Sequence, residues 1–175
     1  MKRISASVRK KAGKIKLLLL DVDGVLTDGR IIVDDRGVET KQFHVRDGQG
    51  INLLMRSGIE VGLITGRSSR VVGHRAKDLG IRIVHQGVQD KLAAYSGIKT
   101  KARLRDEQIA YVGDDIIDLP ILRQAGLAVA VQDGWPGLAA FVDLITEASG
   151  GNGAVREVAE LLLRAQCKWP DQVGR

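Results

Sequence analysis

Acidic, hydroxyl and lysine side chains follow the apolar runs of this sequence at the points where those runs end. Asp21 and Asp23 come directly after four consecutive leucines, Thr65 follows the run EVGLI, and Asp114 follows the run IAYVG, with Lys91 between the last two. Carboxylates brought close together repel one another, and removing them from water is costly. A hard divalent cation with oxygen ligands resolves both problems, so the pattern predicts a Mg²⁺ site.

Zinc is a poorer match, because its usual thiolate and imidazole ligands are not grouped in this chain. His44, His74 and His85 are scattered, and Cys167 is the only cysteine. Each acidic or hydroxyl residue alone also suits an ordinary turn or strand end, and an isolated lysine is usually a solvated surface charge. Their order at successive strand ends is what favours a site.

Continuous apolar runs rich in Val, Ile and Leu indicate the strands that position these residues. Such runs suit a parallel sheet that is covered on both faces better than an alternating antiparallel one. In an open parallel sheet, ligands bind outside the carboxyl ends of the strands. The predicted strands are 16–20, 60–65, 81–85, 108–113, 127–131 and 141–145.

Helical segments alternate with these strands, which predicts an α/β fold with a doubly wound, Rossmann-like and mostly parallel sheet. The exception is residues 30–45, where two β-like arms flank Asp35-Arg36-Gly37 and predict a projecting hairpin. No internal repeat or linker divides the rest. We therefore expect one domain over 16–168, a basic arm at 1–15 and a tail at 169–175. The predicted helices are 48–57, 68–79, 90–101, 118–125 and 153–166.

The formal net charge of +6 comes from the start of the chain. Residues 1–16 hold seven of the 27 Lys/Arg and no acid, so 20 Lys/Arg face 21 Asp/Glu in the rest of the chain. A basic arm can bind nucleic acid, but this one has no aromatic residue to stack on a base. We favour a solvated, partly disordered arm over a nucleic-acid partner, and expect residues 1–14 to be dispensable.

The remaining bulk properties are those of a soluble globular protein. Of the 175 residues, 44% are hydrophobic and 27% are charged, and no apolar stretch approaches the roughly 18 residues of a membrane span. The start of the chain lacks the apolar segment of a signal peptide, and a single cysteine excludes a disulfide within the chain. We expect a cytoplasmic protein with no membrane partner.

Four motifs resemble, in order, the signature motifs of the haloacid dehalogenase-like phosphatases. They are DVDGVLTDG, LITGR, Lys91 and YVGDDIIDLP. Three further stretches resemble a small, capless branch of that family that acts on phosphates of 3-deoxy sugar acids. These are FHVRDGQGINLL, VGDDIIDLPILRQAGLAVAV and SGGNGAVREVAELLL, and with the motifs they cover nearly everything from residue 16 to 168.

The resemblance implies a role for each motif residue. Asp21 would attack phosphorus and become an aspartyl-phosphate, and Asp23 would protonate the departing sugar oxygen and then activate water. Mg²⁺ would be held by the Asp21 carboxylate, the Asp23 backbone carbonyl and the Asp114 carboxylate. Thr65 and Lys91 would bind the phosphoryl oxygens.

The same resemblance implies the residues that contact the sugar acid. At Asn52 some relatives have an arginine, so this position departs from the pattern. For Arg75, on a predicted helix, a surface ion pair is the alternative to substrate binding. The predicted substrate-contacting residues are Asp23, His44, Val45, Arg46, Asp47, Gly48, Asn52, Arg67, Arg75 and Lys91.

Two positions in the last motif remain open from the sequence. Asp115 or Asp118 would orient Lys91 or a metal-bound water, or would be an acid favoured by the dipole at a helix N-terminus.

No segment is long enough for a cap domain over the site, since only residues 24–64 and 66–90 lie between the first three motifs. The capless branch forms tetramers in which hairpins pack together and subunits cover each other's sites, which implies a homotetramer here. Residues 150–153, with Arg156 and the tail, would complete a site in the same or a neighbouring subunit. A flexible, helix-capping connection is the alternative.

Taken together, the resemblance implies a Mg²⁺-dependent phosphatase for the small-molecule sugar phosphate 3-deoxy-D-manno-octulosonate 8-phosphate, in lipopolysaccharide sugar synthesis. One alternative is a nine-carbon 2-keto-3-deoxy sugar acid 9-phosphate as substrate. Another is a noncatalytic oligomerisation domain of the same fold, which the intact motif residues argue against.

Overall fold

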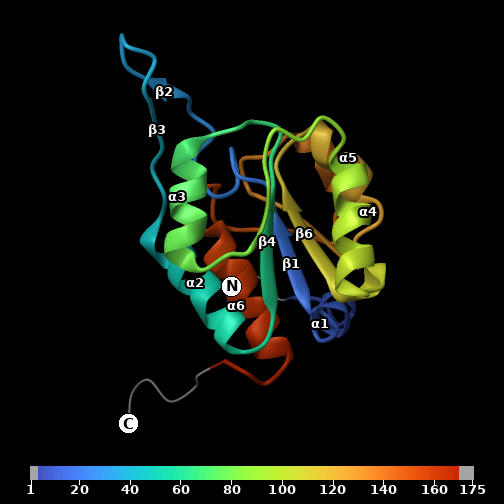
Figure 1. Ribbon diagram of the computed structural model, residues 1–175. Helices are drawn as coiled ribbons and strands as arrows, with labels where there is room; N and C mark the ends of the chain where they lie inside the picture. The colour runs from blue at the N-terminus through green and yellow to red at the C-terminus, as the bar shows by residue number, and fades with distance from the viewer. Residues whose placement is uncertain (1–3, 170–175) are drawn as a thin grey trace.

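The computed structural model describes residues 4–169, in which a parallel sheet lies between two layers of helices (Figure 1). All pairings in the main sheet are parallel, and the strand order is β5-β4-β1-β6-β7-β8. This confirms the predicted doubly wound α/β fold. The six strands are β1 (Leu17–Leu20), β4 (Glu60–Ile64), β5 (Ile83–His85), β6 (Ile109–Gly113), β7 (Leu127–Ala130) and β8 (Leu144–Ile145).

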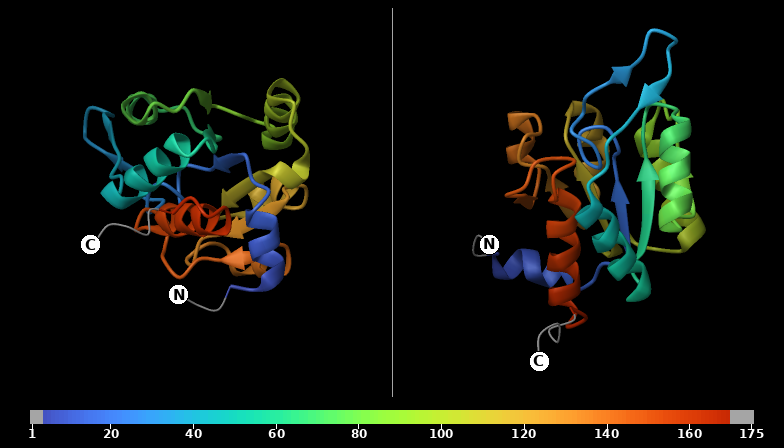
Figure 2. Two further views of the ribbon diagram at one scale, coloured as in Figure 1. Left: turned by 90° about the horizontal axis from the view of Figure 1, so that it is seen from below. Right: turned by 90° about the vertical axis from the view of Figure 1, so that its left-hand side faces the viewer.

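Helices cover both faces of this sheet, with α2, α3 and α6 on one side and α4 and α5 on the other (Figures 1 and 2). Short 3₁₀ turns, η1 (Asp106–Gln108), η2 (Ile116–Asp118) and η3 (Pro136–Ala140), lie between some of the elements. The six α-helices of the described residues are α1 (Ala6–Ala12), α2 (Val45–Arg56), α3 (Arg70–Leu79), α4 (Lys91–Ala102), α5 (Leu119–Leu122) and α6 (Ala154–Ala165).

Strand β1 occupies the middle of the sheet, between β4 and β6. Its four leucines are completely buried. Leu18 and Leu20 belong to the core under α2, α3 and α6, whereas Leu17 and Leu19 belong to the core under α4 and α5. Because successive side chains of a strand point to opposite faces, only an all-apolar run satisfies both cores. This strand therefore fixes the position of the acidic residues that follow it.

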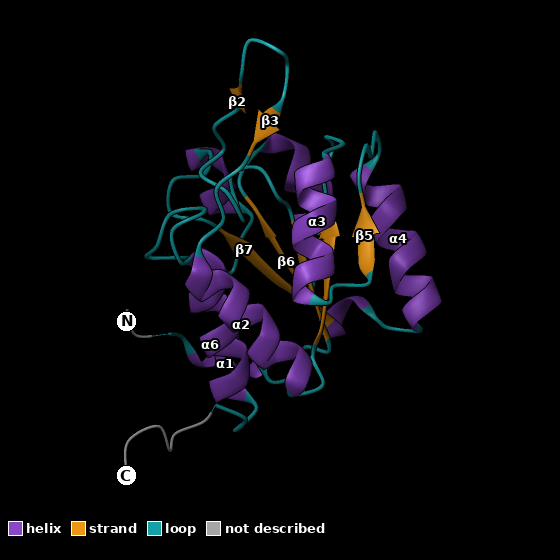
Figure 3. Ribbon diagram, turned by 60° about the vertical axis from the view of Figure 1, so that its left-hand side comes forward, coloured by secondary structure: helices purple, strands orange, loops and turns teal. Residues whose placement is uncertain are grey.

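The predicted hairpin projects beyond the end of the main sheet, as Figures 1 and 3 show. Strands β2 (Ile32–Val33) and β3 (Glu39–Thr40) pair antiparallel, with Ile32 opposite Thr40. The Asp34 carboxylate accepts hydrogen bonds from the backbone N–H groups of Arg36 (3.0 Å) and Val38 (2.7 Å). The short strands are thus closed by a turn that supplies its own hydrogen bonds.

The basic N-terminal segment is not the disordered arm that its charge predicted, at least from residue 4 onward. Ser5 caps helix α1 by accepting a hydrogen bond from the N–H of Val8. Val8, Ala12 and Ile15 are buried in the core that α6 also contributes to. The Gln166 amide donates to the carbonyls of Ala12 (3.2 Å) and Ile15 (2.8 Å), which ties the segment to the end of α6. A few apolar side chains at helical spacing are thus enough to pack this segment against the core, although many of the residues around them are charged.

Residues 1–3 and most of the predicted tail at 169–175 lie outside the described residues, and only Trp169 of that tail is described. Its ring packs against the guanidinium groups of Arg156 and Arg164, whose central carbons are 5.0 and 4.9 Å from the ring centre. Within residues 4–169, no helix is both long and apolar enough to cross a membrane.

Candidate active site

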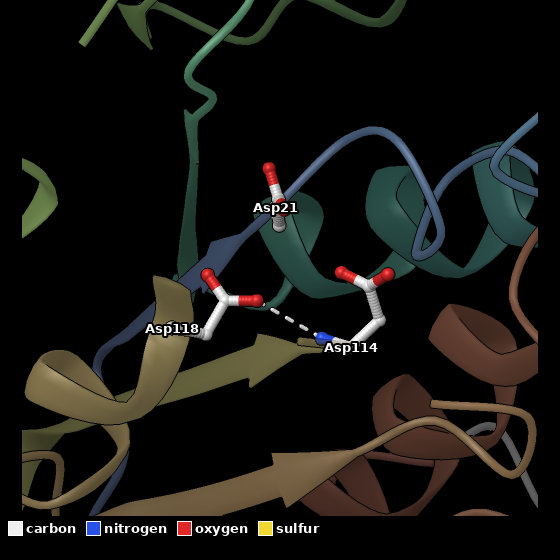
Figure 4. Close-up of side chains that lie close together, drawn as sticks. All are labelled: Asp21, Asp114 and Asp118. Carbon is white, nitrogen blue, oxygen red and sulfur yellow. Dashed lines mark hydrogen bonds between the residues drawn. The ribbon is translucent and has the colours of Figure 1, made fainter. Parts of the chain in front are cut away.

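Three carboxylates meet at the carboxyl ends of β1 and β6. Asp21 follows β1, Asp114 follows β6, and Asp118 ends the turn η2. One oxygen from each lies within 4.8 Å of the other two (Figure 4). Because β1 and β6 are parallel neighbours, their carboxyl ends reach the same edge of the sheet, and the acids that follow them are forced together.

Lys91, the first residue of α4, connects two of these carboxylates. Its Nζ lies 2.8 Å from Asp21 Oδ2 and 2.8 Å from Asp118 Oδ1. Burial alone would lower the pKa of Lys91, but the charges of Asp21 and Asp118 outweigh it and raise that pKa. Lys91 is therefore a permanent cation at neutral pH, aimed into the group of carboxylates.

Asp118 has no free hydrogen-bonding capacity. Its Oδ1 accepts from Lys91 and from the Tyr111 hydroxyl (2.6 Å), and its Oδ2 accepts from the backbone N–H groups of Asp114 (3.0 Å) and Asp115 (3.3 Å). A carboxylate has about four lone-pair sites, and all of them are used here. Of the two interpretations left open by the sequence, the structure supports the one in which Asp118 orients Lys91. Asp115 is exposed and accepts a hydrogen bond from the N–H of Ile116.

Asp21 and Asp114 are left as the acids with coordination sites to offer. Burial, reinforced by the neighbouring Asp118 charge, raises the pKa of Asp21 to about 6 despite the opposing Lys91. Burial and the charges of Asp21 and Asp118 raise the pKa of Asp114 to about 7. Two partly desolvated carboxylates, of which only Asp21 is paired with Lys91, fit a divalent cation, which would relieve their repulsion through oxygen ligands.

The loop after β1 is packed tightly against this site. Gly24 has a φ of +90°, and a Cβ at this position would lie 2.1 Å from Asp114 Oδ2. From the other end of the chain, Gly150 approaches so closely that its Cβ would lie 1.7 Å from the Gly24 carbonyl oxygen. Only glycine fits either position, so the loops that carry Asp23, Asp114 and Gly150 hold one another in place.

Asp23 points to a different set of partners from Asp21. Its Oδ1 accepts a hydrogen bond from Lys41, and its Oδ2 lies 3.6 Å from Arg67 Nε. Glu39 also binds both cations, with its Oε1 2.9 Å from Arg67 Nη2 and 3.3 Å from Lys41 Nζ. The Ser69 hydroxyl donates to the other Glu39 oxygen.

Sequence reasoning missed Glu39, Lys41 and Tyr111 at this site. A signal existed for the first two, since alternate residues of a strand share a face, and ETK places Glu39 and Lys41 on the same side of the hairpin. No comparable local signal marked Tyr111, because it lies inside an apolar strand that explains its presence equally well.

Thr65 directly follows β4, the other neighbour of β1, and is 2% exposed. Its hydroxyl accepts the backbone N–H of Arg67 at 3.4 Å. A pocket of 460 Å³ lies against this edge and reaches Lys91, with Gly66, Val88 and Ile117 among its lining residues. An opening therefore leads from solvent to the lysine.

Residues 44–48, five of the predicted sugar-contacting residues, lie at the start of α2, but they face different partners. His44 caps α2 by accepting the N–H of Arg46 at 3.2 Å, while Val45 is 77% exposed. His44 and Arg46 line a 310 Å³ pocket together with Asn152 and Arg156. The arrangement brings the 44–46 segment together with the glycine-rich loop before α6.

The Asp47 side chain binds the backbone at the start of α6. Its carboxylate accepts the backbone N–H groups of Gly153 (3.2 Å) and Arg156 (2.7 Å), and so caps α6 from α2. Burial raises its pKa despite these hydrogen bonds. The cap of α6 thus comes from Asp47 on α2, and Gly153 at the N-cap makes no side-chain cap hydrogen bond. The completion of a site by residues 150–153 stays a prediction.

Arg75 forms the ion pair that was its alternative. Its Nη1 lies 2.7 Å from Asp78 Oδ2, and its guanidinium carbon lies 5.7 Å from the centre of the Phe43 ring. The same group packs against Gly48, where a Cβ would lie 2.4 Å from Arg75 Nη2. Asn52 lies half-buried on α2. The predicted contacts of these residues with substrate stay predictions.

Known proteins are similar to this chain in both sequence and architecture. A family model for haloacid dehalogenase-like hydrolases matches residues 75–158. The chain is 48% identical to the 3-deoxy-D-manno-octulosonate 8-phosphate phosphatase KdsC of Escherichia coli (strain K12) over 98% of this chain and 92% of that protein.

Two solved structures extend the similarity to the fold. The crystal structure of the Yersinia pestis 3-deoxy-D-manno-octulosonate 8-phosphate phosphatase matches with a TM-score of 0.93 at 46% identity, over 95% of this chain and 90% of that one. The Moraxella catarrhalis phosphatase in complex with magnesium ion, phosphate ion and KDO has a TM-score of 0.91 at 48% identity, over 93% of each chain. The chain therefore belongs to the haloacid dehalogenase-like hydrolases.

Proposed function

We propose that this protein is a Mg²⁺-dependent phosphatase that hydrolyses 3-deoxy-D-manno-octulosonate 8-phosphate to the free sugar acid and phosphate. The observation that carries the proposal is the buried contact of Lys91 with Asp21 and Asp118, beside the Asp114 carboxylate. Relatives that are named for that activity match along nearly the whole chain. The motif residues are all present, which argues against a noncatalytic domain of the same fold.

The reaction we propose has two displacements at phosphorus. In the first, an Asp21 carboxylate oxygen forms a bond to phosphorus while the bond from phosphorus to the sugar oxygen breaks, and that oxygen takes a proton from Asp23. In the second, a water oxygen attacks the aspartyl-phosphate and gives a proton to Asp23, and the bond between phosphorus and Asp21 breaks. Asp21 and Asp23 then return to their starting states.

Lys91 and Thr65 are the residues we assign to the phosphoryl oxygens, where negative charge must be balanced during transfer. Mg²⁺, held by the carboxylates of Asp21 and Asp114 and the backbone carbonyl of Asp23, would neutralise charge and align the phosphoryl group. Asp118 supports this arrangement by holding Lys91, and we assign it no direct contact with the Mg²⁺.

For the sugar acid, we assign recognition to the start of α2 and to Arg67 and Arg75, which follow β4. Arginine can bind a carboxylate with two parallel hydrogen bonds, and Arg67 already contacts the carboxylates at the site entrance. Asp47 and Gly48 contribute through the shape of the α2 terminus. The residues assigned to sugar recognition are Asp23, His44, Val45, Arg46, Asp47, Gly48, Asn52, Arg67, Arg75 and Lys91.

We further propose that the enzyme is a homotetramer and acts in the cytoplasm. The hairpin exposes an apolar group to solvent in the single chain, with Ile31 59%, Val33 57% and Val38 55% exposed. Apolar side chains clustered on a projecting element favour contact with another subunit. The single cysteine is consistent with a reducing compartment.

Phosphate release from a panel of sugar phosphates tests the substrate. The panel contains 3-deoxy-D-manno-octulosonate 8-phosphate and the nine-carbon 2-keto-3-deoxy sugar acid 9-phosphates, each assayed with Mg²⁺ and with EDTA. We expect metal-dependent release with the highest kcat/KM for the eight-carbon substrate. Preference for a nine-carbon substrate would overturn the assigned sugar, and no release from any substrate by folded, Mg²⁺-loaded protein would overturn the phosphatase.

A further inference from the structure

Lys41, at the base of the projecting hairpin, is buried although a charged lysine side chain is usually exposed to solvent. It follows β3 directly, and its side chain is 1% exposed. A fully buried lysine is rare unless its ammonium is paired, because desolvating an isolated charge is costly.

The partners of Lys41 are acidic residues from two different segments. Lys41 donates a hydrogen bond to Asp23 Oδ1 and lies 3.3 Å from Glu39 Oε1. Arg67 Nε faces the other oxygen of Asp23 at 3.6 Å, and Arg67 Nη2 lies 2.9 Å from Glu39. Two cations and two carboxylates alternate around the entrance, so their charges cancel and each oxygen of Asp23 faces a cation.

This arrangement restrains the direction of the Asp23 carboxylate. A carboxylate on a short side chain can turn about two bonds, and a proton-transferring group is effective only when it lies within hydrogen-bonding reach of the reacting oxygen. We propose that Lys41 is a positioning residue that holds Asp23 in its productive orientation and that Glu39 supports it. This inference rests on the proposed function, in which Asp23 transfers the proton.

The hairpin does not need Lys41 to form its turn. Arg36 and Asp34 pair within the tip at 2.9 Å, and the backbone N–H groups of Arg36 and Val38 bind Asp34. Lys41 instead points back to the loop after β1. The hairpin is thus connected to the site through the Lys41–Asp23 ion pair and through the contacts of Glu39 with Arg67 and Ser69, in addition to any role in assembly.

A double-mutant cycle between Lys41 and Asp23 tests the proposal directly. Lys41→Met removes the charge and keeps most of the apolar stem, and Asp23→Asn removes the proton-transferring group. The proposed sugar phosphate is an alkyl phosphate, with an alkoxide as leaving group. We expect Lys41→Met alone to lower kcat on this substrate by about 10²-fold, within the range of general acid–base catalysis. In the Asp23→Asn background the same change should cost little more, because the group through which Lys41 acts is already missing. If Lys41→Met lowers kcat by the same factor in the wild-type and Asp23→Asn backgrounds, the proposal is overturned.

The leaving group supplies a second readout that a purely structural role would not change. An alkoxide needs a proton as it departs, whereas p-nitrophenolate departs without one. Lys41→Met should therefore lower kcat/KM for the alkyl phosphate much more than for p-nitrophenyl phosphate, and Lys41→Arg should restore part of the difference. Equal losses on both substrates in a folded variant would show that Lys41 acts on stability or phosphate binding instead.

Arg36→Met is the matched control, since it removes a cation from the same hairpin at a position that is 80% exposed. Glu39→Gln, which keeps the side-chain size, serves if Lys41→Met does not fold, and a smaller loss with the same dependence on leaving group is expected. Circular dichroism and size measurements establish the fold and assembly of each variant. If wild-type protein hydrolyses other alkyl phosphates but not the eight-carbon sugar, the assigned sugar fails while the Lys41 cycle is read on those substrates.

Discussion

Asp118, in the turn that follows β6, lies 2.8 Å from Lys91, and the side chain of Asp118 is completely buried. The lysine in turn reaches Asp21 at the same distance. Asp118 thus determines where the cation lies relative to the proposed nucleophile, without touching the substrate itself.

Asp118→Asn should lower kcat by about 10–100-fold, because an amide nitrogen cannot accept the hydrogen bonds that Asp118 receives. Lys91 would then pair with Asp21 alone and withdraw charge from it. Steady-state kinetics on the sugar phosphate measures the loss. Asp90→Asn, the same exchange at the exposed cap of α4, should leave kcat close to wild type, since asparagine caps helices equally well. An unchanged kcat for Asp118→Asn would contradict the assigned role.

Asp21→Asn should reduce turnover by about 10⁴-fold or more while the fold is retained, because the amide is not a nucleophile towards phosphorus. The volume is unchanged, so circular dichroism should match wild type. Asp35→Asn, in the exposed hairpin turn, provides the same exchange outside the site. Near-normal turnover by folded Asp21→Asn protein would remove Asp21 as nucleophile.

Stabilisation by Mg²⁺ should increase as pH rises from 5.5 to 8. Burial and neighbouring acids raise the pKa values of Asp21 to about 6 and Asp114 to about 7, above their unfolded values. The metal-free protein therefore loses stability as pH rises towards these values, and only the deprotonated acids bind Mg²⁺ well. At 100-fold excess over Kd, the ion should raise Tm at pH 8 by about 5–10 °C, and by less at pH 5.5. Thermal denaturation with Mg²⁺ or EDTA at both values is the test, and an equal or larger shift at pH 5.5 would contradict it.

Deleting residues 1–14 should lower Tm by about 5–15 °C, because the deletion uncovers the core under α1 and α6. The sequence alone predicted that this segment was dispensable, and the burial of Val8 and Ala12 reverses that expectation for stability. At 25 °C kcat/KM should persist, since α1 lies at the end of the sheet opposite the hairpin (Figure 1). Val8→Asn should destabilise, whereas Lys10→Asn, at an exposed position of the same helix, should not. An unchanged Tm after the deletion would show that α1 contributes nothing.

Gly150→Ala should impair catalysis, because its Cβ would fall within 1.7 Å of the Gly24 carbonyl oxygen and push the loop that carries Asp23. We expect a loss of at least about 10-fold in kcat/KM, since small displacements of catalytic groups are costly. Gly97→Ala, on α4 with nothing within 4 Å of the added atom, should be neutral or slightly stabilising. Comparable kinetics for the two variants would argue against the close packing.

The sequence allowed most of the sheet and the three carboxylates to be predicted, for a physical reason. Strands buried on both faces must be continuously apolar, as β1 is, and parallel topology brings the residues after such strands to one edge. The position of Asp21 relative to Asp114 thus follows from two local patterns and one rule of topology.

What the sequence did not reveal depends on how distant segments fold back. Lys41 reaches Asp23 only because the hairpin bends over the loop after β1, and Asp47 caps α6 only because two helices lie side by side. Helix α1 was missed for another reason. Its many charges dominated the composition, although Ser5 as cap and Val8 with Ala12 at helical spacing were visible in the sequence.

The close approach of Gly150 to Gly24 also constrains the order in which the protein matures. Ribosomes make the loop after β1 early and the glycine-rich loop late, and the α6 terminus that Asp47 caps is later still. Pairing of segments so far apart in the chain has a loop-closure cost, and it cannot form before the later segment has been made. A nascent chain that has not yet emerged through residue 156 thus carries every acidic residue of the site but lacks the contacts that fix them, so catalytic competence arises near the end of translation.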